Sequence, residues 1–179
     1  MISFMMSALS RMYQGAGFTA FSNAHPHCWV VWEPGVWKPP AKDAHTLTSL
    51  HVPTPPPAAG EALALALAVR PGKPPQLILG RAPSCNIEIN DATLSQVHLL
   101  FMQAGPAKWT VRDAGSKNGS WVDGAQLVPG EPKALTDGMR IQTAQVVLTY
   151  YEPPGLFARL QQQPGAGGAT PVPHAQTGP

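Results

Sequence analysis

The stretch Gly80–Gly124, GRAPSCNIEINDATLSQVHLLFMQAGPAKWTVRDAGSKNGSWVDG, alternates short apolar runs with polar, glycine-rich segments. The apolar runs have the length of β-strands and are bounded by Gly, Pro, Asn or Asp, which is typical of sheet proteins. They are Asn86–Ile89, His98–Met102 and Lys108–Val111. Binding residues concentrate on loops held by a rigid scaffold. The stretch therefore predicts a β-domain that presents a binding site on its polar loops.

Four fragments of this stretch resemble, in order and spacing, the signature of forkhead-associated (FHA) domains. They are Gly80-Arg81, Ser95-x-x-His98, Asp113-x-Gly-Ser-x-Asn118-Gly119 and Val122-x-Gly124. The resemblance covers residues 63–151 and implies an all-β fold, an FHA-type antiparallel β-sandwich of about eleven strands. FHA domains bind phosphothreonine peptides at loops on one end of the sandwich. The resemblance therefore implies a phosphothreonine-dependent binding module, acting as a signalling adaptor downstream of a Ser/Thr kinase.

The resemblance also implies roles for single residues. Those that match phosphate-contacting positions are Arg81, Ser95, Gln96 and Lys117, while Asn118 matches the residue that holds the peptide backbone. The structural positions that shape the loops are matched by Gly80, His98 and Gly119. Gln96 departs from the family, because many members carry a basic residue there. The site is therefore expected to bind phosphate with one charge fewer, unless Lys117 compensates.

The chemistry of Arg81 agrees with a phosphate-binding role. A guanidinium suits bidentate contact with phosphate, and the neighbouring Gly80 lets another backbone approach closely. The alternative is a surface arginine that pairs with Asp91 or Asp113. Residue type alone leaves both interpretations open.

The other two loops carry uncharged and cationic donors. Ser95 and Gln96 offer a hydroxyl and an amide that can donate to phosphate oxygens, whereas the alternative is a turn capped by a serine. The turn Gly115–Gly119 places a lysine at its apex beside an asparagine that can hold another chain's backbone. The alternative for this turn is an ordinary hairpin.

Ser95, His98 and Asp113 are also the residue types of a catalytic triad. A serine on a strand three residues before a histidine directs the two side chains to opposite faces, and no glycine elbow accompanies it. We therefore expect no enzyme and no cofactor. The more serious alternative to phosphothreonine binding is a phosphate-independent interaction or oligomerisation module, which FHA-like domains can also be.

The composition and charge of the chain argue against other kinds of partner and site. The chain has 179 residues, 21 prolines, 17 glycines and a formal charge of +2, and residues 61–152 hold eight basic and eight acidic residues. A neutral domain lacks the basic stripe of a nucleic-acid binder. Cys28 and Cys85 give no disulfide framework, and His25-Pro-His27-Cys28 lacks the second ligand pair of a structural zinc site. No apolar run has membrane-spanning length, so we expect a cytoplasmic protein without membrane insertion.

The chain divides into four segments. Residues 1–37 are expected to form an α/β extension with a helix over 3–13 and a strand over 28–32, and residues 38–60 a proline-rich linker. The resemblance implies an FHA-type domain over residues 61–152, in which the alternating EALALALAVR of 61–70 predicts a strand with leucines inward and alanines outward. Residues 153–179 should hold a short helix and a disordered tail. A phosphorylated linker threonine, Thr46, Thr48 or Thr54, is a further candidate ligand, bound by its own or a neighbouring copy's domain. The alternative is that these are unmodified threonines of an ordinary linker.

Overall fold

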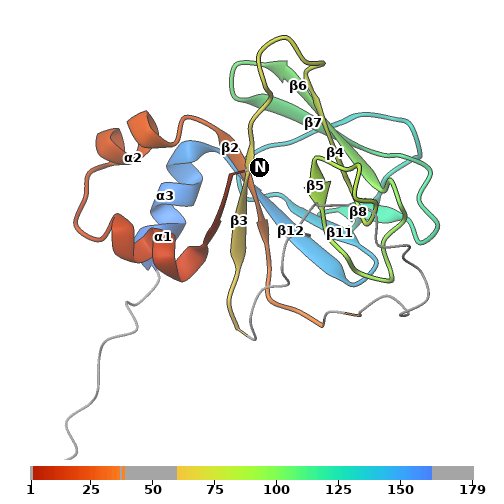
Figure 1. Ribbon diagram of the computed structural model, residues 1–179, viewed down its shortest axis with the longest axis horizontal. Helices are drawn as coiled ribbons and strands as arrows, with labels where there is room; N and C mark the ends of the chain where they lie inside the picture. Colours follow the sequence, from red (N-terminus) through yellow and green to blue (C-terminus); the bar gives the residue numbers. More distant parts are fainter. Residues whose placement is uncertain (1, 37, 39–59, 163–179) are drawn as a thin grey trace, which may run out of the picture.

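The computed structural model describes residues 2–36, 38 and 60–162. These residues form a sandwich of two β-sheets with three helices on one side (Figure 1). The strands are β1 (Ser3–Met5), β2 (Cys28–Trp32), β3 (Leu63–Leu67), β4 (Gln76–Gly80), β5 (Ile87–Glu88), β6 (Leu99–Gly105), β7 (Lys108–Asp113), β8 (Ser120–Val122), β9 (Ala125–Gln126), β10 (Lys133–Ala134), β11 (Arg140–Thr143) and β12 (Val146–Tyr151). The helices are α1 (Met6–Met12), α2 (Phe18–Ala24) and α3 (Pro153–Gln162). The predicted β-sandwich is confirmed.

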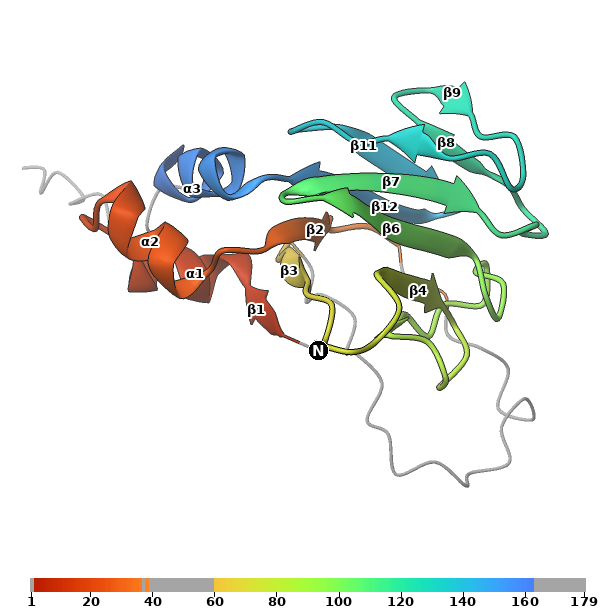
Figure 2. The same ribbon diagram turned by 90° about the horizontal axis from the view of Figure 1, so that it is seen from above.

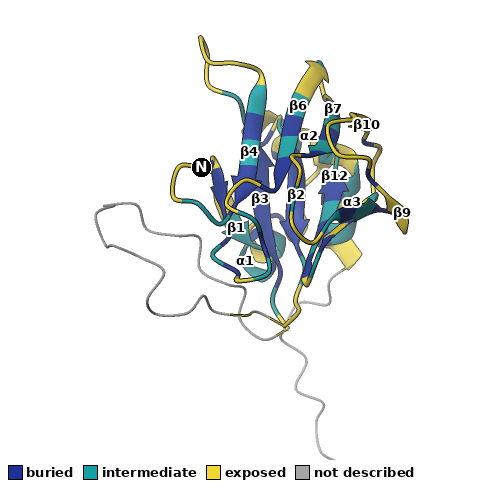
Figure 3. Ribbon diagram, turned by 90° about the vertical axis from the view of Figure 1, so that its right-hand side faces the viewer, coloured by how far each residue is buried: buried dark blue, intermediate teal, exposed yellow. Residues whose placement is uncertain are grey.

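One sheet has seven strands in the order β1-β3-β2-β12-β11-β8-β9, and the other has five in the order β10-β7-β6-β4-β5. All pairs are antiparallel except β4 and β5, which run parallel. Figure 3 shows the middle strands β2, β3 and β4 largely buried, while the edge strand β9 is exposed. Residues of both sheets, among them Leu65, Leu79, Phe101 and Ile141, form the main core between them.

The strand predicted from the alternating leucines and alanines is confirmed as β3. Leu63, Leu65 and Leu67 face the core between the sheets, as the period of two requires. The alanines face outward, but they too are buried, because they belong to a second core beneath the helices. Small side chains on this face let the helices approach the sheet closely.

The second core lies on the outer side of the seven-stranded sheet, where Figure 2 shows α1 and α2 beside β1. It joins Leu9 of α1, Phe21 of α2 and Leu156 of α3 to Trp29 of β2. Arg159 of α3 also forms an ion pair with Glu33. The molecule therefore has three layers, with the helices on the side away from the five-stranded sheet.

The strand predicted at residues 28–32 is confirmed as β2, and it lies inside the sheet between β3 and β12. All five of its residues are buried, because its two faces serve the two cores. The helix expected over 3–13 is shorter, since Ser3–Met5 pairs with β3 and α1 begins only at Met6. The short C-terminal helix is present as α3. The three linker threonines and the predicted disordered tail lie outside the described residues.

Candidate functional site

The strand order brings the three polar loops to one end of the sandwich. β4 runs antiparallel to β6, and β6 runs antiparallel to β7. The end of β4 at Gly80, the start of β6 at Leu99 and the end of β7 at Asp113 therefore share one end of this sheet. The loops that carry the predicted site residues follow or precede these three points. The first loop follows β4 and begins at Arg81, the second precedes β6 and holds Ser95 and Gln96, and the third follows β7 and holds Gly115–Gly119.

Gly80 lies where the second loop crosses the first. A Cβ atom on Gly80 would overlap with the backbone carbonyl of Gln96, so this position requires glycine. Two backbone hydrogen bonds close the contact, from the Arg81 N–H to the Ser95 oxygen at 3.0 Å and from the Ala82 N–H to the Gln96 oxygen at 3.1 Å. The structure thus brings the backbones of Arg81 and Ser95 together.

The alternative interpretation of Arg81, an ion pair with Asp91 or Asp113, is not what the structure contains. No ion pair joins Arg81 to a carboxylate of the described residues. Asp91 accepts hydrogen bonds from Thr93 and from the backbone of Lys38, and Asp113 accepts bonds from its own loop. Arg81, a half-buried residue, therefore forms no ion pair with either aspartate.

The third loop is tied to the second through a side chain. The Lys117 N–H donates to Ser95 Oγ at 2.9 Å. Because a hydroxyl both donates and accepts, the Ser95 O–H can still donate to another group. The side chains of Lys117 and Gln96 are exposed at the surface next to this bond.

His98 is completely buried between two of the loops. Its Nδ1 accepts a hydrogen bond from the Ser95 N–H at 3.0 Å, and its Nε2 lies 3.3 Å from the Gly119 oxygen. An acceptor Nδ1 fixes the neutral tautomer with its proton on Nε2, which donates to Gly119. Burial lowers the pKa of His98 and favours this neutral form. Such contacts are what the predicted structural role requires.

Asn118 reaches back from the third loop to the second. Its Nδ2 donates to the Thr93 carbonyl at 2.7 Å, while the residue remains exposed. One amide N–H and the Oδ1 atom are left for a ligand backbone. The following Gly119 has a φ of +76°, and a Cβ there would meet the Trp121 ring at 3.1 Å. Gly119 therefore shapes the turn that presents Asn118.

Ser95, His98 and Asp113 do not form a catalytic triad in the structure. Ser95 Oγ accepts from Lys117, and the His98 ring bonds to two backbone groups. The Asp113 carboxylate bonds to neither residue. The hydroxyl, ring and carboxylate thus each serve the loop geometry.

Asp113 is a supporting residue to which the sequence analysis gave no role in the site. Its buried carboxylate accepts the N–H groups of Gly115 at 2.8 Å and Ser116 at 2.7 Å, and the hydroxyls of Ser116 at 2.6 Å and Ser120 at 2.5 Å. Burial acts to raise the pKa of Asp113, but these hydrogen bonds outweigh it and lower the pKa. An aspartate two residues before a glycine is a turn signal, so the sequence contained this information.

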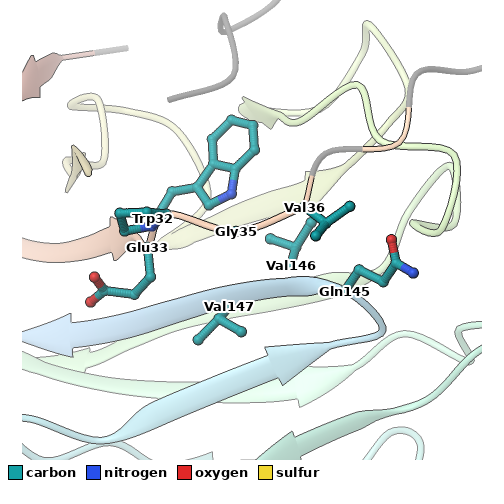
Figure 4. A pocket seen from close by; sticks show the side chains of 8 residues that line it. Trp32, Glu33, Gly35, Val36, Gln145, Val146 and Val147 are labelled. Atoms are coloured by element: carbon teal, nitrogen blue, oxygen red, sulfur yellow. The ribbon is translucent and has the colours of Figure 1, made fainter. Parts of the chain in front are cut away.

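A small hollow lies elsewhere, between the end of β2 and the start of β12 (Figure 4). Its lining includes Trp32, Val36 and Val147, and no predicted site residue takes part. Within the described ranges, no group of three or more His, Cys, Asp and Glu side chains could hold a metal ion. None of the helices described has the length and apolar character needed to cross a membrane.

No curated protein matches the chain. Among solved structures, the FHA domain of the CT664 protein of Chlamydia trachomatis is 15% identical, with a TM-score of 0.45, and the match covers 69% of this chain and 96% of that one. The FHA domain of an Arabidopsis thaliana hypothetical protein is 22% identical, with a TM-score of 0.46 and coverage of 70% and 86%.

A third similar structure is the N-terminal FHA domain of Saccharomyces cerevisiae Rad53p in complex with a phosphothreonine peptide. It is 18% identical, with a TM-score of 0.45, and the match covers 70% of this chain and 93% of that one. The model of the FHA domain family matches residues 77–144, the part of the chain that holds all three loops. Residues 77–144 therefore belong to the FHA domain family.

Proposed function

We propose that this chain is a phosphothreonine-dependent peptide-binding module. The observation that carries the proposal is the meeting of three loops at Ser95, whose carbonyl accepts the Arg81 N–H and whose hydroxyl accepts the Lys117 N–H. Two cationic residues and a hydroxyl thus come from one small area of the surface. A phosphothreonine carries a charge of about −1.5 to −2 at pH 7 and three strong acceptor oxygens, which suit such donors.

Each site residue has a distinct proposed task. Arg81 and Lys117 neutralise the phosphate, while the Ser95 hydroxyl and the Gln96 amide donate hydrogen bonds to its oxygens. Asn118 holds the peptide backbone through the N–H and Oδ1 that its bond to Thr93 leaves available. The match of residues 77–144 to the FHA domain supports this ligand, because FHA homologues bind phosphothreonine peptides.

The test is a comparison of three peptides that differ only in carrying phosphothreonine, phosphoserine or unmodified threonine. Phosphothreonine should be retained far better than the other two, and equal retention of all three would contradict the proposal. Losing one charge-assisted hydrogen bond costs about 1.5–3 kcal/mol, so Arg81→Ala should weaken binding roughly ten-fold or more. Arg70→Ala, an exposed arginine in the loop between β3 and β4, is the matched control.

In the cell, the module would act as a cytoplasmic adaptor without enzymatic activity, downstream of a Ser/Thr kinase. The alternative is an interaction or oligomerisation module that needs no phosphate. Arg81→Ala separates the two functions, because unchanged binding to a natural partner would favour the alternative.

The chain's own linker is a second proposed ligand, in its phosphorylated form. Lys38, the first residue of the linker, packs against the second loop. Its N–H donates to Asp91 Oδ2 at 2.8 Å, and its carbonyl accepts the Ala92 N–H at 2.8 Å. The linker thus starts beside the proposed site. Thr46 and Thr48 follow it along the chain, and a short tether can supply an effective concentration of the order of millimolar.

Thr54 lies only six residues before Gly60, so it would more readily reach a neighbouring copy. Incubation with a threonine kinase, followed by site mapping and measurement of mass in solution, tests self-recognition. Competition with an added phosphopeptide, or an increase in mass, is expected. If the linker is phosphorylated while peptide affinity and mass stay unchanged, self-recognition is wrong.

A further inference from the structure

The second loop is held from inside by a carboxylate that the proposed binding mode does not use. Asp91 is fully buried. Its Oδ1 accepts the Thr93 N–H at 2.8 Å and the Thr93 hydroxyl at 2.5 Å, and its Oδ2 accepts the Lys38 N–H at 2.8 Å. A buried carboxylate needs such donors, and here two of the three come from one residue.

Thr93 passes this constraint to the site through its backbone. The next residue, Leu94, is buried in the main core and donates its N–H to the Asp91 carbonyl at 3.1 Å. The peptide group between Thr93 and Leu94 is therefore fixed at both ends. Its carbonyl accepts Nδ2 of Asn118 at 2.7 Å.

This single bond determines which way the Asn118 amide faces. A carbonyl oxygen can only accept, so the amide must present nitrogen to Thr93. A rotation of the amide by 180° would place two oxygens against each other. The Oδ1 atom and the second N–H of Asn118 are thereby directed away from Thr93 in a defined order.

We infer that Asp91 is a positioning residue of the site, acting through Thr93 to fix the Asn118 amide before a ligand arrives. The inference rests on the proposed function, in which Asn118 binds the ligand backbone, and Asp91 itself does not contact the ligand. Without the carboxylate, Thr93 loses both of its bonds to Asp91, and only the Leu94 end of the peptide group stays fixed. Ligand binding must then order the Asn118 amide, which lowers affinity.

A double-mutant cycle tests the path of this effect. Asp91→Ala should weaken binding of a phosphothreonine peptide about three- to ten-fold in the otherwise unchanged protein. In an Asn118→Ala background the same change should cost less than about two-fold, because its target is gone. In an Arg81→Ala background the full loss should remain. Equal losses in the first two backgrounds would overturn the inference.

The free protein supplies a readout that needs no ligand. The side-chain amide signals of Asn118 in an NMR spectrum, assigned by their loss in Asn118→Ala, should shift toward those of an unbonded asparagine in Asp91→Ala. Thr93→Val removes only the hydroxyl, keeps the side-chain shape and should give a smaller shift in the same direction. If Asp91→Ala does not fold, Thr93→Val takes its place in both the peptide-binding cycle and the NMR measurement. Unchanged Asn118 signals in the folded variants would overturn the inference.

Asp123→Asn is the matched control, because the Asp123 carboxylate also accepts a backbone N–H, that of Arg140 at 2.8 Å, in the turn after β8. It should alter neither peptide affinity nor the Asn118 signals. Failure of the proposed function is distinguishable from failure of this inference. If the protein binds no phosphothreonine peptide, the proposed function is wrong. The NMR shift then still shows whether Asp91 holds the Asn118 amide.

Discussion

Gln96 shows how one residue can have a fixed backbone and an adaptable side chain. Its carbonyl accepts the Ala82 N–H at 3.1 Å and the Cys85 thiol at 3.1 Å, and it lies against Gly80. The residue is nevertheless exposed, and it follows Ser95, the residue that bonds to the backbones of Arg81 and Lys117. A change at this side chain can therefore alter ligand binding without disturbing the loop.

We predict that Gln96→Arg tightens phosphothreonine-peptide binding by up to about 1–2 kcal/mol, because a guanidinium adds a charge-assisted bond to phosphate. Titration calorimetry measures the gain. Gln103→Arg, an exposed position later in β6, controls for the added charge. A dissociation constant that does not change would mean that Lys117 already serves this role or that the residue 96 side chain points elsewhere.

Gly80→Ala should destabilise the domain, because the new methyl group would overlap with the Gln96 carbonyl in a backbone-to-backbone contact. Overpacking of this kind costs about 1–3 kcal/mol. Urea unfolding measures the loss. Gly105→Ala is the control, since a Cβ there meets its nearest atoms at an ordinary 3.9 Å. Equal stability of the two variants would contradict the packing argument.

At the scale of elements, one histidine joins the helical layer to the sheet. His25 follows α2, and its ring centre lies 5.3 Å from those of Phe4 and Phe21, 5.4 Å from that of Tyr13 and 5.6 Å from that of Trp29. It is buried, and no hydrogen bond to its Nε2 is found in the described part of the chain. No local signal in the sequence could show that His25 lies at the centre of these four aromatic rings.

The pKa of His25 is lowered, first by burial and then by the nearby His27. Because the folded pKa lies below the ordinary value of 6.5, the unfolded chain binds more protons between the two values. Stability is therefore complete above about pH 6.5 and falls as the pH drops through the folded pKa.

His25→Phe should keep the fold and reduce the loss of stability between about pH 7.5 and about pH 5.5, because it removes the group that becomes protonated on unfolding. Urea unfolding at both pH values provides the measurement. His98, whose pKa is also lowered by burial, remains in this variant and keeps part of the pH dependence. An identical pH dependence in the variant and the parent protein would show that His25 does not contribute.

At the scale of the whole molecule, the sequence predicted the parts with local signals better than those created by tertiary packing. The loops with Arg81, Ser95 and Asn118 were located by motif spacing, and β3 by its alternation. The two-residue strands β9 and β10 were not expected, since such strands have no periodic signal. The burial of Asp91 was not expected either, because it depends on Lys38 and Thr93 folding around this side chain.

The position of β2 within the sheet could not be predicted from the sequence, for a similar reason. Its sequence predicted a strand, but its neighbour β3 begins only at Leu63, after a long proline-rich segment. Nothing local indicates that two strands so far apart pair along five residues. The same pairing explains the helical layer. It places the apolar side chain of Trp29 on the outer face of the sheet, where the helices bury it.

The placement of β2 means that the covalent link between residues 38 and 60 is not what holds the first part of the chain to the rest. Residues 28–32 pair with β3 on one side and β12 on the other, and contribute to both cores. The protein should therefore behave as two complementary fragments. With a protease site introduced between residues 39 and 59, the N-terminal and C-terminal fragments should elute together in size-exclusion chromatography after cleavage. The complex of the two fragments should keep its peptide affinity. A Val30→Asp change, which puts a charge into the main core, should let them separate.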